Sequence, residues 1–127
     1  MIKYQHSTGA EQGSFPPFPV GDELVLTSVS LHGIGPDDIV VLRIEIGWAN
    51  PGTFDMGELE VLLRRDAPDG EAVEWYLESC FLSAVTRIEY RTTGGLPDQV
   101  YYLCVRSTDQ LAVMNGPYRL EGRVEAR

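Results

Sequence analysis

The sequence is short of basic residues and contains no long apolar run. Ten Lys and Arg residues stand against nineteen Asp and Glu residues, which gives a formal net charge of −9. A negative protein repels phosphate backbones and anionic lipid headgroups, so we expect no nucleic acid among its partners. No stretch approaches the ~20 apolar residues that a membrane-spanning helix requires. No apolar h-region follows Lys3, the single early base, so we recognise no signal peptide.

Histidine, a common residue of catalytic and metal sites, occurs only twice. His6 lies in a polar N-terminal segment and His32 stands beside a Gly/Pro turn. A Ser/His or Cys/His nucleophile site would need one of these positions, and a His-based metal site needs more imidazoles. Phosphate-binding glycine loops are absent as well, because the Gly/Pro turn at residues 33–36 is too short. We predict no catalytic residue, no cofactor and no enzyme activity.

Carboxylates are abundant, and this abundance weakens any argument from a particular pair. Asp37 and Asp38 are adjacent, and a second group consists of Asp55, Glu58 and Glu60. Oxygen ligands suit calcium, but neither group has the alternating spacing of a dedicated calcium loop. We therefore predict no metal site. A small hydrolase that uses two facing carboxylates is the third hypothesis for the function, after the two developed below.

Cys80 and Cys104 are the only cysteines, and they form neither a CxxC motif nor a zinc ligand set. Apolar and aromatic residues surround both, which is typical of buried free thiols. The alternative is a disulfide between Cys80 and Cys104, which requires the two residues to lie on neighbouring strands and to face the same way. We favour free thiols and keep the disulfide as the alternative.

The first 21 residues are rich in proline, glycine and small polar residues. The prolines favour an extended, polyproline-like course that places Phe15 and Phe18 on the same side. Fully extended, the first 20 residues span roughly 66–72 Å, well beyond the ~13 Å radius of gyration of the remaining chain. We predict that residues 1–21 form an extended N-terminal arm that docks in a groove or along a sheet edge of a neighbouring subunit. The expected anchor residues are Ile2, Tyr4, Phe15, Pro16, Pro17, Phe18 and Val20.

Residues 22–127 alternate mostly with a period of two, as half-buried strands do. Residues 37–49 place apolar side chains on one face and Arg43 and Glu45 on the other. Residues 116–127 alternate apolar and ionic side chains in the same way, and Gly/Pro/Asp turns separate further strand-like segments. This pattern predicts an all-β fold, an antiparallel jelly-roll sandwich of about eight strands that spans residues 22–127.

Two segments, residues 55–66 and 71–84, fit both a helix and a strand. In the first, Asp55 and Glu58 have the spacing of a helical capping box. The apolar residues of both segments also keep a helical spacing, namely Leu59, Leu62 and Leu63 in the first and Val73, Leu77, Phe81 and Ala84 in the second. The same residues fit two strands joined by a Pro-Asp-Gly turn, and we favour strands.

The acidic residues are concentrated in the middle of the chain. Residues 21–80 carry thirteen acids and three bases, whereas residues 81–127 carry five acids and six bases. Patches of opposite sign could orient identical subunits head to tail, because a heterologous contact joins two different surfaces. The alternative explanation is a solvated acidic face.

Aromatic residues support a second hypothesis for the function. A row of exposed rings could form a platform on which sugars stack, as in a carbohydrate-binding β-sandwich module. The ordinary role of such rings is in the core and in cross-strand pairs. The residues concerned are Trp48, Trp75, Tyr76, Tyr90, Tyr101 and Tyr102.

The order of the segments PPFPV, VVLRIEIGW, GELEVLLRRDAP, VTRIEY, VYYLCVRS and GPYRLEG resembles the TNF/C1q-type jelly-roll domains of bacterial spore-surface filaments and exosporium. The resemblance implies eight to ten antiparallel strands and assembly through sheets, with residues 15–19 as an anchoring leader. The chain has no collagen-like stalk, which favours direct stacking of subunits.

We therefore expect a structural subunit that self-assembles into a surface fibre or ring. The implied partners are further copies of the chain and an anchor protein of a spore or cell surface. The implied location is that surface, with the cytoplasm as the alternative.

Overall fold

The computed structural model describes residues 1–52 and 55–127. These residues form nine strands and no helix, so none of them belongs to a helix long and apolar enough to cross a membrane. The strands are β1 (Ile2–Ala10), β2 (Phe18–Val20), β3 (Leu24–Leu31), β4 (Ile39–Ala49), β5 (Gly57–Arg65), β6 (Ala72–Cys80), β7 (Ser83–Thr93), β8 (Gln99–Arg106) and β9 (Ala112–Glu125).

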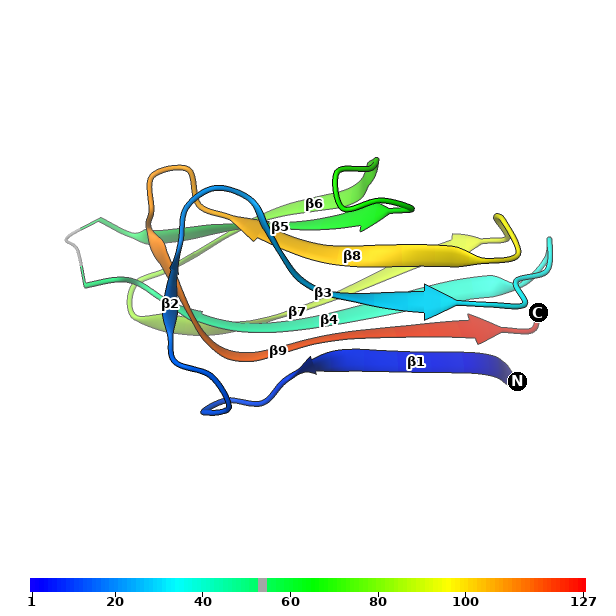
Figure 1. Ribbon diagram of the computed structural model, residues 1–127. Coiled ribbons are helices and arrows are strands. Elements are labelled where there is room, and N and C mark those ends of the chain that lie inside the picture. The colour runs from blue at the N-terminus through cyan, green and yellow to red at the C-terminus, as the bar shows by residue number, and fades with distance from the viewer. Residues whose placement is uncertain (53–54) are drawn as a thin grey trace.

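The strands form two antiparallel sheets that pack face to face (Figure 1). Sheet A has the order β1-β9-β4-β7, and β2 pairs with the beginning of β9; sheet B has the order β3-β8-β5-β6. The chain crosses repeatedly from one sheet to the other, which is the connectivity of a jelly roll. The predicted all-β jelly-roll sandwich is therefore confirmed.

Both segments that also fit helices are strands. Residues 55–66 contain β5 and residues 71–84 contain β6, and the two strands pair as an antiparallel hairpin. The helix-like spacing of leucines in β5 arises because this central strand is buried on both faces. Leu59 and Leu63 point into the core, while Leu62 is only 3% exposed on the outer face.

The core lies between the sheets and is built from alternate residues of the long strands. Its largest fully buried side chains are Trp48 and Tyr101, which bring polar atoms with them. The indole Nε1 of Trp48 donates a hydrogen bond to Thr86 Oγ1, and the Tyr101 hydroxyl donates one to Gln99 Oε1. Every buried side-chain nitrogen and oxygen in the described part of the chain has a hydrogen-bond partner.

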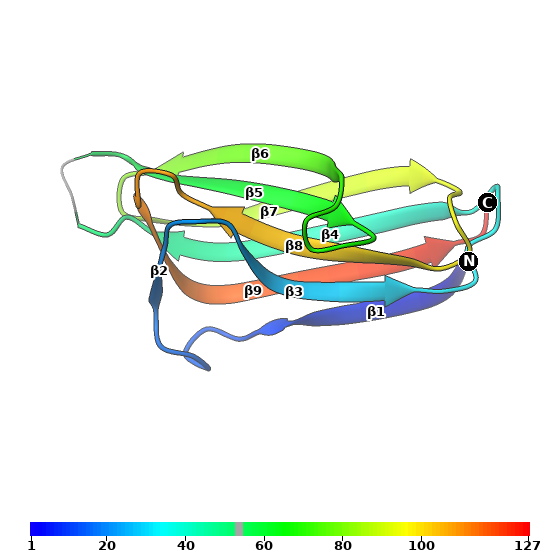
Figure 2. The ribbon, with the colours of Figure 1, turned by 45° about the horizontal axis from the view of Figure 1, so that its top comes forward.

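The two chain ends meet at one end of the sandwich, while β2 and the beginning of β9 lie together at the other end (Figures 1 and 2). At the first end, the amide of Ala126 donates a hydrogen bond to the carbonyl of Met1. Strand β1 pairs with β9 of the same chain from Ile2 to Ala10, so it forms an edge of sheet A. The docking of residues 1–21 on a neighbouring subunit, and their separation from a domain at residues 22–127, stay predictions.

Candidate functional site

The N-terminal segment contacts its own chain through both strands and through the residues between them. The ring of Phe15 lies 5.4 Å from that of Tyr118 and 5.7 Å from that of Phe18, measured between centroids. Val20 is fully buried in the core. The predicted orientation of Phe15 and Phe18 to one side thus agrees with their packing, while Pro16 and Pro17 are exposed.

The side chains of β1 also reach sheet B and close that flank of the sandwich. Thr8 donates a hydrogen bond to the carbonyl of Ser28 and accepts one from Thr27, with 2.6 Å between the two threonine hydroxyls. The amide of Ser30 donates to Nδ1 of His6 at 3.0 Å. These bonds satisfy polar groups of β3, which is an edge strand and would otherwise expose them.

The beginning of β1 is fixed by Lys3 and Tyr4. Lys3 forms an ion pair with Asp38, and this hydrogen bond together with one from the amide of Gly35 lowers the pKa of Asp38 below its ordinary value of 3.8. The ring of Tyr4 meets that of His32 edge-on, with 5.5 Å between centroids. Ile2 is 48% exposed. The beginning of β1 is therefore held by an ion pair, an edge-on ring contact and the main-chain pairing with β9.

The outer face of sheet A carries a regular array of charges, which we call the arginine ladder. On β4, Arg43 lies opposite Glu89 of β7 and Glu121 of β9, and Glu45 lies opposite Arg87 and Arg119. A third row places Arg91 and Arg123 on either side of Val41. Five arginines and three glutamates therefore form the ladder: Arg43, Arg87, Arg91, Arg119, Arg123, Glu45, Glu89 and Glu121.

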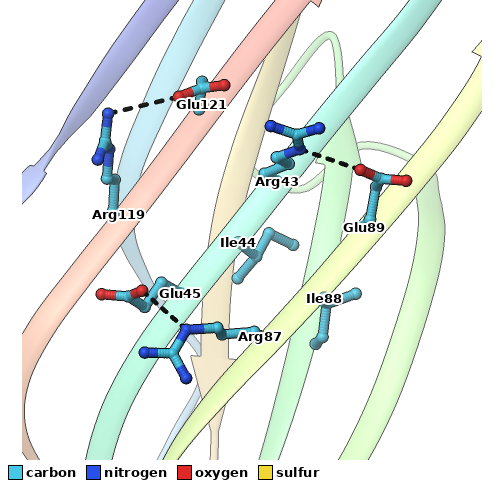
Figure 3. A pocket seen from close by; sticks show the side chains of 8 residues that line it. All are labelled: Arg43, Ile44, Glu45, Arg87, Ile88, Glu89, Arg119 and Glu121. Atoms are coloured by element: carbon cyan, nitrogen blue, oxygen red, sulfur yellow. Dashed lines mark hydrogen bonds and ion pairs between the residues drawn. The ribbon is translucent and has the colours of Figure 1, made fainter.

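A hollow of about 310 Å³ lies in the ladder between β4, β7 and β9 (Figure 3). Ion pairs cross it from Arg43 to Glu89 at 3.0 Å and from Arg87 to Glu45 at 3.1 Å. The Arg87 side chain is 71% exposed, and its Nη atoms make no bond within the described chain, whereas Nε is used for Glu45. The ladder thus offers guanidinium donors to a partner even though its charges are paired internally.

The outer face of sheet B carries a second ionic group. Arg64 binds Glu23 through two hydrogen bonds of 2.7 and 2.8 Å, and Arg106 binds Glu60 through two of 2.9 and 3.1 Å. Bonds of this kind hold a carboxylate ionised. Arg64 lowers the pKa of Glu23, and Arg106 lowers that of Glu60, in both cases below the ordinary value of 4.5.

Exposed apolar side chains lie beside this ionic group, on β6 and in the turn that follows it. Trp75 and Leu77 point outward from β6, opposite Leu62 and Glu60, and are 52% and 54% exposed. The indole Nε1 of Trp75 donates a hydrogen bond to Glu60 at 3.0 Å. The next two apolar residues along the chain are Phe81 and Leu82, which are 78% and 82% exposed. Trp75 and Leu77 line the same hollow on this face, and neighbouring exposed apolar side chains are typical of a surface that binds another protein.

The aromatic residues named for a sugar platform do not share a face. Trp48 and Tyr101 are fully buried, and Trp75 is the one member of the set whose ring is more than half exposed. Tyr76, Tyr90 and Tyr102 are half-buried. The row of exposed rings on which the carbohydrate-binding hypothesis depends is therefore not formed.

Cys80 and Cys104 lie on β6 and β8, with β5 between them, and both thiols are free. Cys80 lies opposite Gly57 and Cys104 lies opposite Leu62, five residues further along β5. Five residues of strand correspond to about 17 Å, beyond the reach of a disulfide. Burial raises the pKa of Cys104 to about 11 and also raises that of Cys80.

The acidic residues and histidines considered as catalytic or metal-binding groups do not come together in one site. Asp38 belongs to the Lys3 ion pair, and His32 contacts Asp98 at 2.9 Å on the surface. Within residues 1–52 and 55–127, no three His, Cys, Asp or Glu side chains are grouped so that they could hold a metal ion.

Comparison with solved structures finds this fold in a subunit of Bacillus endospore appendages, which are described as a novel family of disulfide-linked pili. The match covers 100% of this chain and 92% of that chain, with a TM-score of 0.50 and 10% sequence identity. A part of dimeric latent PorU from Porphyromonas gingivalis also matches 98% of this chain but only 13% of its own, with a TM-score of 0.50 and 11% identity. The resemblance to spore-surface filament proteins is thereby confirmed as a likeness of fold. No family model and no curated protein matches the sequence.

The sequence pattern predicts the ionic rows of β4 and β9 but does not show that these strands are neighbours. It gives no sign of the ionic group of Glu23, Arg64, Arg106 and Glu60. The alternation of Arg87, Glu89 and Arg91 in β7 was the available signal for the ladder. The arginine ladder as a whole depends on the order of the strands in sheet A, and the sequence pattern does not reveal that order.

Proposed function

We propose that this chain is a non-enzymatic structural subunit that self-assembles into a surface fibre or ring. The observation that carries the proposal is the full-length likeness in fold to a subunit of Bacillus endospore appendages, which are pili. The exposed apolar patch on β6 and the arginine ladder support it, because a subunit needs surfaces for its neighbours. We further propose a spore or cell surface as its location and an anchor protein there as an additional partner.

We propose that residues 1–21 dock on the neighbouring copy, with β1 pairing to the neighbour's β9 in place of its own. Exchange of an identical element creates no new kind of contact, since every bond seen within one chain is re-formed between two chains. The segment is suited to this because β1 is an edge strand whose pairing with β9 ends at Ala10. Residues 11–17 join β1 to β2 within the docked segment; they are mostly exposed and contain two prolines, which keep them extended.

The contacts within this proposed assembly are non-covalent. The pili whose subunit has a similar fold are described as disulfide-linked. Here residues 1–21 contain no cysteine, Cys104 is fully buried on β8, and Cys80 is a half-buried free thiol on β6. The exchanged strand would instead be held by its main-chain hydrogen bonds, by Phe15 on Tyr118, and by Val20 in the core.

The experiment is a reversible lock that keeps β1 on its own chain. Thr8 and Thr27 have their hydroxyl oxygens 2.6 Å apart. The two side chains point at each other, so cysteines at both positions are placed to form a disulfide. The variant Thr8→Cys/Thr27→Cys is made in a background with Cys80→Ala and Cys104→Ala.

The oxidised lock should stop growth of the assembly and reduction should restore it, as followed by light scattering and negative-stain microscopy. The cysteine-free background serves as the matched control, because it contains no lock and should assemble in both redox states. Equal growth of the oxidised and the reduced protein would contradict strand exchange.

A further inference from the structure

The charge asymmetry of the sequence becomes an asymmetry between the two outer faces of the sandwich. The arginine ladder covers the outer face of sheet A, on β4, β7 and β9. The exposed apolar residues Trp75 and Leu77 lie on the outer face of sheet B, on β6. These two faces are opposite sides of one molecule, so a contact between them in successive copies is heterologous and repeats from copy to copy, as an open fibre or a closed ring.

A hollow of about 200 Å³ adjoins Trp75 on the sheet B face. Three carboxylates line it, and no basic side chain does. Glu60 is already bound by Arg106, but neither Glu58 nor Asp109 has a salt bridge to any residue that the structure describes. The full lining consists of Glu58, Glu60, Trp75, Leu77, Ser107, Thr108 and Asp109.

We propose that this hollow, the acceptor hollow, receives arginine side chains from the ladder of a second copy of the chain, so that subunits stack face to face. This inference rests on the proposed self-assembly and names a surface that carries it. The argument for a second copy is charge complementarity. Glu58 and Asp109 of the acceptor hollow have no salt bridge within the described residues, and the five arginines of the ladder outnumber the four glutamates of the same face, with Glu125 included. A guanidinium fits the hollow because it stacks on an indole ring and binds carboxylates at the same time.

Arg87 is the arginine best placed to enter the hollow. It belongs to the edge strand β7 and its side chain is 71% exposed. The exposed rings and methyl groups around the acceptor hollow would then be covered by the aliphatic stems of the ladder arginines. Burial of Trp75 supplies the apolar part of the contact, and the charges fix its orientation.

The experiment uses two charge reversals that compensate each other. Arg87→Glu places an acid in the ladder, and Glu58→Arg places a base in the acceptor hollow. Each variant alone sets like charges against one another, so the concentration needed for assembly should rise about tenfold or more. A 1:1 mixture should assemble as an alternating copolymer, because each reversed surface finds a reversed partner and each original surface finds an original one.

Arg127→Glu is the matched control for Arg87→Glu. It makes the same change of net charge at the C-terminal residue, outside both surfaces. Circular dichroism melts establish that each variant is folded. The sequence contains two tryptophans, of which Trp48 is fully buried, so acrylamide quenching of fluorescence reports on Trp75. Assembly should protect this fluorescence, and raising the salt from about 0.1 M to about 1 M should weaken assembly as the Debye length falls from ~10 to ~3 Å.

The outcomes separate this contact from the proposed function. If the wild-type protein assembles while both reversals assemble equally well and Trp75 stays quenchable, face-to-face stacking is wrong and self-assembly stands. If the wild-type protein stays monomeric, both are wrong. Rescue in the mixture alone supports the contact between the ladder and the acceptor hollow.

Discussion

The ring of Phe15 packs against the ring of Tyr118, with centroids 5.4 Å apart and planes inclined by 53°. Phe15 belongs to the residues between β1 and β2, and Tyr118 belongs to β9, which pairs with both of these strands. Phe18 touches the same ring of Phe15 at 5.7 Å. This aromatic group holds a proline-containing segment that has few other contacts with the sandwich.

Replacing Phe15 with alanine should loosen residues 11–17. The ring is half-buried, so the expected loss of stability is about 1–2 kcal/mol. A Glu-specific protease should cleave after Glu11 several-fold faster in Phe15→Ala than in the wild type. Gln5→Ala, which changes an exposed residue of β1 outside residues 11–17, is the control and should leave the cleavage rate nearly unchanged.

The hydrogen bond from Trp48 Nε1 to Thr86 Oγ1, at 3.2 Å, joins β4 to β7 inside the core. The variant Thr86→Val keeps the shape of the side chain but leaves the buried indole N–H without an acceptor. The expected cost is about 1–3 kcal/mol of unfolding free energy, measured by urea denaturation. Thr92→Val changes a half-buried threonine of the same strand and should cost clearly less.

The thiol of Cys104 should react only after unfolding. Burial raises the pKa of Cys104 to about 11, so at pH 8 almost none of it is the reactive thiolate. Titration under denaturing, non-reducing conditions should find two reactive thiols per chain. In the native protein the reaction of Cys104 should follow the rate of unfolding, and fewer than two thiols in denaturant would show that a disulfide forms.

Stability should fall as the solution becomes acidic. The pKa values of Glu23 and Glu60 are lowered by Arg64 and Arg106, so the folded state favours the ionised carboxylates. Their contribution is present above the ordinary value of 4.5 and is lost as the pH falls through their lower folded values. Thermal melts from pH 7 to pH 3 should show this loss.

The pH dependence should be weaker in Glu60→Gln, which removes one of these titrations. Glu71→Gln is the control: its side chain is 70% exposed, and the substitution should leave the pH dependence of stability unchanged. Identical acid profiles of Glu60→Gln and the wild type would show that the ionic group of sheet B does not stabilise the fold.

The alternation of apolar and polar residues predicts most of the fold, because a strand with one face in the core repeats every two residues. Residues 39–49 show this clearly: their inward side chains Val40, Leu42 and Ile46 are fully buried. The pattern fails for β5, where Leu62 is buried on the outer face beneath its neighbours, so the spacing resembles that of a helix. Periodicity alone does not distinguish a helix from a strand that is buried on both faces.

The surfaces for assembly are harder to predict than the strands. Arg43, Glu89 and Glu121 are distant in the sequence, and only the order β9-β4-β7 brings them together. The N-terminal segment illustrates a second difficulty. Its composition predicts an extended course, and β1 and β2 are extended, but composition does not specify whether they pair with their own β9 or with that of a neighbour.

The most direct test of the proposed self-assembly is negative-stain electron microscopy of the purified full-length protein across a range of concentrations. The account predicts rings or fibres of uniform width whose repeat corresponds to one jelly-roll sandwich. Single particles of monomer size at every concentration, in buffer of low ionic strength and neutral pH, would contradict it.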